Sequence, residues 1–378
     1  MKSVFVIFVV IAMLALAFLL MRDDAAVAEN GNDSAASVQA DAPGADIADA
    51  PVSVEEETPV ADLECPDYSG PNDPRKSFGD IQNELTSAVV SLQGSGQPEH
   101  WLAAAILLAS EDTPTAMALL QRLLAIDATA QLAAFQLLRL CDDRNRTECY
   151  AQDIEDAIID ADKDNAAMWI QMASLRLNAG REQDAIDALR QAIHAPRLAN
   201  YFGAQIDVLD RGLAAVTGWT YSERVIYGAD AVISKPFDLS AIRGFCRLSD
   251  AAGWREVCDA VGERVVAEGG DLSVRIQGAE LRLSLDENRD SPELMAVISE
   301  ERDRLNAMRS SLFSDAGHLN LILNDETVMR AFIEAYDVDG EEGAMLTLEE
   351  RASQLRASPD YDQCNFVSNP FIRVSPLD

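Results

Sequence analysis

The feature that most constrains the fold of this chain is a helical spacing of apolar residues that runs from about residue 78 to residue 357. Stretches rich in Ala, Leu, Gln and Arg, such as 101–109 and 116–124, repeat apolar residues three and four positions apart. This is the period of a helix that buries one face, and alternating strand patterns are scarce. The pattern therefore predicts an all-α body. Helix-start signals recur at Thr113-Pro114, at Ser291-Pro292 and in the capping-box pattern Thr347-x-x-Glu350.

Part of the helical stretch matches itself at a period of 34 residues. Trp101, Phe135 and Trp169 are separated by this period. The same shift aligns Ala104 with Leu138 and Met172, Met117 with Ala151 and Ala185, and Leu124 with Ile158 and Ala192.

The segment from 166 to 200 carries the most complete copy, with Trp169-x2-Met172-Ala173, then Ala185 in a second helix and a late Pro196. This copy resembles the tetratricopeptide (TPR) family, whose repeat has the same length. The resemblance covers about residues 97–200, and it departs from the family where Ala173 and Arg176 replace the usual Gly and Tyr. It implies a solenoid of stacked helix hairpins, because a lone hairpin leaves one apolar face uncovered.

The rest of the body divides by composition. We expect TPR-like repeats over 77–200, a further α-helical region over 201–359 and an extended C-terminal tail over 360–378. Aromatic residues gather between Tyr201 and Phe237, where they are expected in the core; a peptide-binding surface is the alternative. Beyond them, helices are expected over 239–267, 272–285, 292–312, 326–336 and 348–357.

The N-terminal segment predicts export. Residues 4–21 form a run of 18 apolar or uncharged residues, which as a helix spans about 27 Å, close to the hydrocarbon thickness of a bilayer. We expect residues 1–22 to act as a transmembrane signal anchor. The alternative is a cleaved signal peptide, because Ala26-Val27-Ala28 fits a cleavage site. The body is then extracytoplasmic and membrane-anchored, periplasmic in a Gram-negative cell, or secreted if the segment is removed.

An acidic linker follows over residues 23–76. Between 23 and 74 the chain has 14 Asp and Glu and no Lys or Arg, a composition that cannot bury enough surface to order itself. The whole chain carries a net charge of -34, of which residues 75–378 contribute -22. This charge disfavours nucleic acid as a partner, because phosphate backbones are repelled, and it favours a basic protein partner.

Six cysteines fit an oxidising compartment. Cys141 and Cys149 flank an expected hairpin turn, and Cys246 and Cys258 flank another, so each pair is expected to form a disulfide. The remaining pair, Cys65 and Cys364, would fasten the linker to the C-terminal tail.

No motif for catalysis, cofactor binding or metal binding is present, and none of these functions is predicted. Asp337-Val338-Asp339-Gly340 looks like part of a calcium loop. Setting Gly340 at the invariant glycine position places Ala335 and Leu346 where oxygen ligands belong. We therefore expect an acidic turn between helices.

The functional prediction is a non-enzymatic, membrane-tethered scaffold that binds a protein or peptide in the cell envelope. The partner-binding groove is expected along the first helix of each repeat, at Gln136, Arg139, Gln171, Ser174 and Asn178.

Two alternatives stay open. One is a hydrolytic enzyme with a site in the C-terminal helices, marked by a pocket with a buried carboxylate of raised pKa. The other is a structural envelope protein that associates with itself through its helices.

Overall fold

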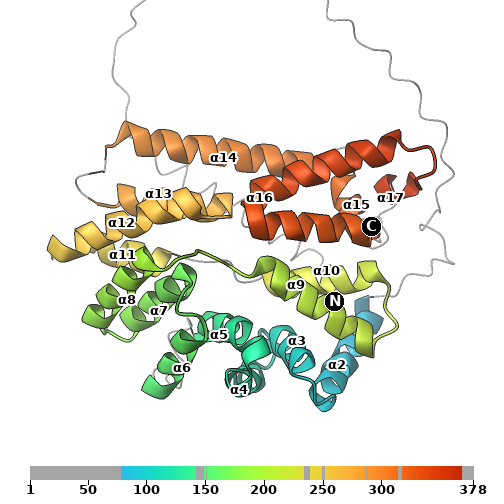
Figure 1. Cartoon of the computed structure of the whole chain (residues 1–378), viewed down its shortest axis with the longest axis horizontal. Coiled ribbons are helices and arrows are strands. Elements are labelled where there is room, and N and C mark those ends of the chain that lie inside the picture. The colour runs from blue at the N-terminus through green and yellow to red at the C-terminus, as the bar shows by residue number, and fades with distance from the viewer. Residues whose placement is uncertain are drawn as a thin grey trace, which may run out of the picture. The chain divides into compact units, whose positions relative to one another are not determined.

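The computed structural model describes residues 78–141, 149, 151–233, 239–248, 252–285, 288, 290–313 and 317–367. These residues form sixteen helices, and their only extended pairing is an isolated bridge between Asn165 and Arg197 (Figure 1). The expectation of an all-α body is confirmed. The chain divides into two units, Met1–Glu64 and Cys65–Asp378, and every described residue belongs to the second. The predicted N-terminal anchor and nearly all of the acidic linker lie outside the described residues, as does the end of the C-terminal tail.

The first half of the described chain is a series of short helices, each packed against the next along the chain. They are α2 (Phe78–Gly94), α3 (Pro98–Leu108), α4 (Thr113–Leu123), α5 (Asp127–Cys141), α6 (Gln152–Asp162), α7 (Ala166–Asn178) and α8 (Glu182–His194).

The pair α7 and α8 is the hairpin that the sequence pattern predicted best. Asn165 begins α7, with its side-chain oxygen accepting a hydrogen bond from the Ala167 N–H at 3.1 Å. Gly180 has a φ of 72° in the turn, a left-handed conformation that suits glycine. Four alanines at the helix interface are at most 1% exposed, which shows how closely the two helices approach: Ala173, Ala185, Ala188 and Ala192.

The 34-residue alignment holds for α3 and α7 but loses phase between them. Trp101 and Trp169 are each the fourth residue of their helices, whereas Phe135 is the ninth of α5. Ala151, aligned with the buried Ala185, is exposed and precedes α6. The reason is that α5 is longer than α3 and the connection to α6 is longer than the turn between α7 and α8. The structure supports packed helix pairs, with a repeat less regular than the alignment predicted.

The helices of the second half vary more in length, from 4 residues in α17 to 32 in α16. They are α9 (Phe202–Val216), α10 (Tyr221–Ile233), α11 (Ser240–Leu248), α12 (Ala252–Glu268), α13 (Leu272–Leu283), α14 (Pro292–Phe313), α15 (His318–Asn324), α16 (Glu326–Ala357) and the short α17 (Cys364–Val367). Helix α9 packs against α2, α3 and α10, and it also touches α16. Gly212 of α9 lies against α3, where an added Cβ would be 2.7 Å from the Cβ of Ala103.

Aromatic residues after α8 contribute to the core, as expected. Trp219 is 4% exposed and donates its indole N–H to Glu84 of α2 at 2.5 Å. Tyr201, Phe202 and Tyr221 are partly buried and pack against the same core. Phe237, the last of the aromatic residues in this stretch, lies outside the described residues.

Two predicted helix starts need correction. The cap of α4 is Asp112, which accepts from the Thr115 N–H, so Thr113 is already inside the helix. Thr347 does not begin a helix, because α16 continues through it. The break in α16 is a kink at Gly340, with φ 73° and ψ -168°, which is also where an acidic turn was expected. By contrast, Ser291 caps α14 as predicted, accepting from the Leu294 N–H at 3.4 Å.

Both predicted disulfides across helix hairpins are confirmed. Cys141 and Cys149 are joined at the end of α5, with Cα atoms 5.5 Å apart, and Cys246 and Cys258 join α11 to α12, with Cα atoms 6.2 Å apart. Cys364 is also disulfide-bonded. Cys65, its predicted partner, lies outside the described residues, so that pairing stays a prediction.

Among the described helices, none combines the length and apolar character that crossing a bilayer requires. Residues 4–21, where the anchor is predicted, are outside that set.

Candidate functional site

Two of the five predicted groove residues bond to the protein's own second half. Gln136 of α5 donates to the side-chain oxygen of Gln205 on α9. Arg139 donates to the same oxygen at 2.9 Å and to the carbonyl of Val232 on α10 at 3.2 Å. Burial lowers the pKa of Arg139 to about 10. Gln136 is buried, whereas Arg139 keeps part of its surface exposed.

The other three predicted groove residues lie along α7 at helical spacing. Ser174 is buried, whereas Gln171 and Asn178 are partly exposed. The side-chain nitrogen of Gln171 is buried and has no hydrogen-bond partner among the described residues. The structure thus brings Gln136 and Arg139 together through Gln205. The predicted groove positions that keep exposed surface are Arg139, Gln171 and Asn178.

A buried polar network joins the hairpin stack to α9. The carboxylate of Asp162, 3% exposed, accepts from Asn165 at 3.0 Å, from Arg197 at 2.5 Å and from the Tyr201 hydroxyl. Burial, and then the hydrogen bond to Asp162, raise the pKa of Tyr201 to about 12. The network holds the chain where it leaves α8 and enters α9. It was missed because its members are spread from 162 to 201 with no local motif.

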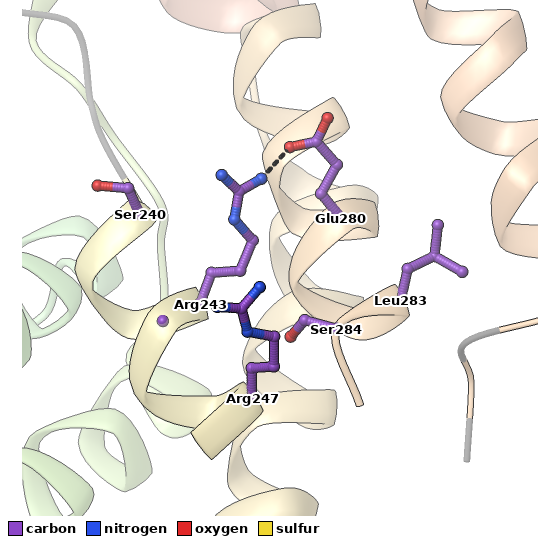
Figure 2. Close-up of a pocket in the computed structure, with 7 residues that line it drawn as sticks. Ser240, Arg243, Arg247, Glu280, Leu283 and Ser284 are labelled. Carbon is purple, nitrogen blue, oxygen red and sulfur yellow. Dashed lines mark hydrogen bonds and ion pairs between the residues drawn. The ribbon is translucent and has the colours of Figure 1, made fainter. Parts of the chain in front are cut away.

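A cleft of about 480 Å³ lies between α11 and α13 (Figure 2). From α11 it is lined by Ser240, Arg243, Gly244 and Arg247, and from α13 and the residue after it by Glu280, Leu283 and Ser284. A smaller cavity of about 70 Å³ adjoins it, sharing Ser240, Arg243 and Glu280.

Arginines dominate the charge of this cleft. Arg243 forms an ion pair with Glu280, shown by the dashed line in Figure 2. Arg302 of α14 donates to the other Glu280 oxygen at 3.1 Å, so two cations satisfy the one carboxylate. Arg247, one helical turn beyond Arg243, is exposed. The four-residue spacing of Arg243 and Arg247 is visible in the sequence. The cleft itself exists only because α13 lies opposite α11.

A partly buried carboxylate of raised pKa, that of Asp271, lies elsewhere, where α13 meets α16. Burial, and then the charge of Glu341, raise the pKa of Asp271 to about 7, although a hydrogen bond from Asn200 at 2.6 Å opposes the shift. Asn200 also contacts the Tyr336 hydroxyl at 3.2 Å. Glu341 accepts from the Leu272 N–H at 3.0 Å. None of these residues lines either of the two cavities described above.

The remaining chemistry of the described residues is sparse. They contain no group of three or more His, Cys, Asp or Glu side chains arranged to hold a metal ion. The features that could bind something are therefore the surface of the hairpin stack and the cleft between α11 and α13.

Comparisons with protein-family models, with curated proteins and with solved structures find no match for this chain. The likeness to TPR proteins consequently rests on the helix pairs and on the residues of 97–200.

Proposed function

We propose that this protein is a non-enzymatic scaffold of the cell envelope that is tethered by its N-terminal segment and binds a basic protein or peptide through its TPR-like hairpins. The observation that carries the proposal is the succession of packed helix pairs from α3 to α8. Stacked hairpins of this kind present long, rigid surfaces suited to protein partners. The two described disulfides and the apolar N-terminal run support an extracytoplasmic location.

The structure favours the outer face of α6 over the predicted groove. Asp153, Asp156 and Asp160 are exposed, and their spacing puts them along one side of the helix. None of the three forms an ion pair with a described cation; Asp156 accepts only from Gln152, at 2.7 Å. Because like charges on one face attract a partner of opposite charge and speed its association, we place the basic partner against α6. Gln171 and Asn178 on the adjacent α7 are further proposed contacts.

The test is affinity capture from an envelope extract with the full-length protein. The variant D153N/D156N/D160N should retain the partner at least tenfold less well, and wild-type binding should weaken as salt rises. The matched control is E256Q/E263Q/D303N, which removes three exposed charges from α12 and α14. Equal retention by both variants would refute the α6 surface, and a mass that increases with concentration in the absence of a partner would favour self-association.

A hydrolase remains the second candidate, because Asp271, at the start of α13, is a partly buried carboxylate of raised pKa. It requires hydrolytic activity that is lost in D271N and retained in the charge-matched variant D303N. The separation of Asp271 from both cavities is why we rank this function below the scaffold.

A further inference from the structure

The cleft between α11 and α13 has properties that the scaffold proposal does not use. Arg247 forms no hydrogen bond, ion pair or ring contact with any described residue. Every other arginine whose side chain the structure describes has a carboxylate, amide, carbonyl or aromatic partner, or another contact. An arginine without a partner among the described residues of so acidic a protein is a candidate anion-binding group.

The position of Arg247 directs that group into the cleft. Figure 2 shows the side chains of Arg243 and Arg247 extending from α11 into the space that faces α13. Arg243 is held by Glu280, and Glu280 is itself shared with Arg302. Two guanidinium groups therefore bind this carboxylate, and the cleft holds a further guanidinium, that of Arg247. The excess positive charge in the cleft attracts an oxyanion. The guanidinium group of Arg247 can then donate two parallel hydrogen bonds to a carboxylate or phosphate.

Gly244 keeps one wall of the cleft open. It lies inside α11, where glycine is less favourable than alanine. Packing does not require the glycine, because a Cβ added there would meet no atom within 4 Å. This distinguishes it from Gly262 and Gly278, whose added Cβ atoms would come within 3.0 Å of neighbouring atoms. The missing side chain at 244 enlarges the space beside Arg243 and Arg247.

Size and lining indicate the kind of ligand. A volume of about 480 Å³ lies within the usual range for small organic molecules. Leu283 provides an apolar wall, while Ser240 and Ser284 add hydroxyl groups. We propose that this cleft is a binding site for a small organic anion, in which a carboxylate or phosphate group contacts Arg247 and an apolar portion lies toward Leu283.

The experiment titrates full-length protein, in detergent at constant ionic strength, with butyrate, phenyl phosphate, inorganic phosphate and neutral butyramide. Binding is measured by calorimetry. We expect saturable binding of butyrate or phenyl phosphate, at least tenfold weaker binding of butyramide, and weaker binding of inorganic phosphate than of phenyl phosphate. Which of the two organic anions binds more tightly distinguishes a carboxylate ligand from a phosphate ligand.

Three variants locate the site. R247Q should weaken binding of the organic anion at least tenfold, and G244L, which fills the open wall, should weaken it similarly. R351Q removes an exposed arginine from α16 and should bind as the wild type does. Circular dichroism checks that each variant is folded. Wild-type affinity in both R247Q and G244L, absence of saturable binding, or binding of inorganic phosphate alone would each overturn the proposal.

Discussion

The hairpins α7/α8 and α12/α13 solve the same packing problem in different ways. The first uses alanines at its interface, and the fully buried Glu155 of α6 supports it by accepting from Arg176 and Arg181. The second brings the helix backbones together at Gly262 and Gly278. A Cβ on either glycine would lie within 3.0 Å of the carbonyl oxygen of the other. The packing of α7 against α8 is therefore supported by the buried charge of Glu155. The packing of α12 against α13 depends on the lack of side chains at Gly262 and Gly278.

The largest effect should come from filling the glycine contact. In G278V the added side chain would meet Val265 and the Gly262 carbonyl, because a Cβ alone is already 2.8 Å from Val265 Cγ1. We expect a loss of about 3 kcal/mol in the free energy of unfolding, the upper part of the range for overpacked cores. Urea titration followed by circular dichroism measures it.

The control for this prediction is another helical glycine in open space. G244A should raise the free energy of unfolding by about 0.5–1 kcal/mol, because alanine favours the helix and no neighbour obstructs it. Equal effects of the two substitutions would show that the close backbone contact is not what holds α12 to α13.

The second prediction concerns the two disulfides, which support a hairpin in each half. Replacing Cys246 and Cys258 with serine removes a link across 12 residues, and the chain-entropy model gives a loss of about 3 kcal/mol. Replacing Cys141 and Cys149, 8 residues apart, should cost slightly less, about 2.5 kcal/mol. Unfolding midpoints in urea measure both, and an unchanged midpoint in either double variant would mean that packing alone holds that hairpin.

How much of this could be predicted from the sequence depends on distance along the chain. The all-α class, the α7/α8 hairpin and the bridges at 141–149 and 246–258 followed from local spacing. The hydrogen bond between Gln136 of α5 and Gln205 of α9 did not, because the two residues are 69 positions apart. The close contact between Gly262 and Gly278 could not be predicted for a related reason. A glycine inside a helix adds nothing to the spacing of apolar residues, and its role in packing is visible only once the position of the second helix is known.

The local errors have physical causes too. The pattern Thr347-x-x-Glu350 is compatible with a capping box, but the same residues also occur inside a continuing helix such as α16. The real break, at Gly340, packs against the backbone of Gly270 so closely that no side chain fits between them. For the candidate site, Arg243 and Arg247 stood at helical spacing in the sequence, whereas their cleft required the position of α13.

The third prediction tests how much the buried charge of Glu155 contributes to the free energy of unfolding. E155Q preserves the shape of a side chain that is 0% exposed and removes the charge shared by Arg176 and Arg181. We expect a loss of about 2 kcal/mol in the free energy of unfolding, since charge-assisted hydrogen bonds are replaced by weaker ones. E280Q alters a more exposed pair and should cost less than about 1 kcal/mol. Similar costs for both would remove the distinction between the two halves.

The fourth and smallest effect concerns Asp271, which precedes α13 and bonds to Asn200 in the segment after α8, so it connects the regions of the two hairpins. Its folded-state pKa, about 7, lies above the ordinary value of 3.8. The folded protein therefore favours the protonated acid. The contribution of this group to stability is complete below about pH 4 and is lost as pH rises toward 7.

In D271N the side chain stays neutral at every pH, and its amide oxygen can still accept the hydrogen bond from Asn200. We expect the variant to be more stable than the wild type by about 1–2 kcal/mol at pH 8, a value reduced from the full shift because Asp271 keeps some exposure. The advantage should vanish toward pH 4. The measurement is the difference in urea midpoints between wild type and variant from pH 4 to pH 8, with D303N on the exposed face of α14 as control. A difference that does not change with pH would mean that Asp271 is ionised at the junction, and the link between the two regions would then depend on a charged hydrogen bond to Asn200 instead of a neutral acid.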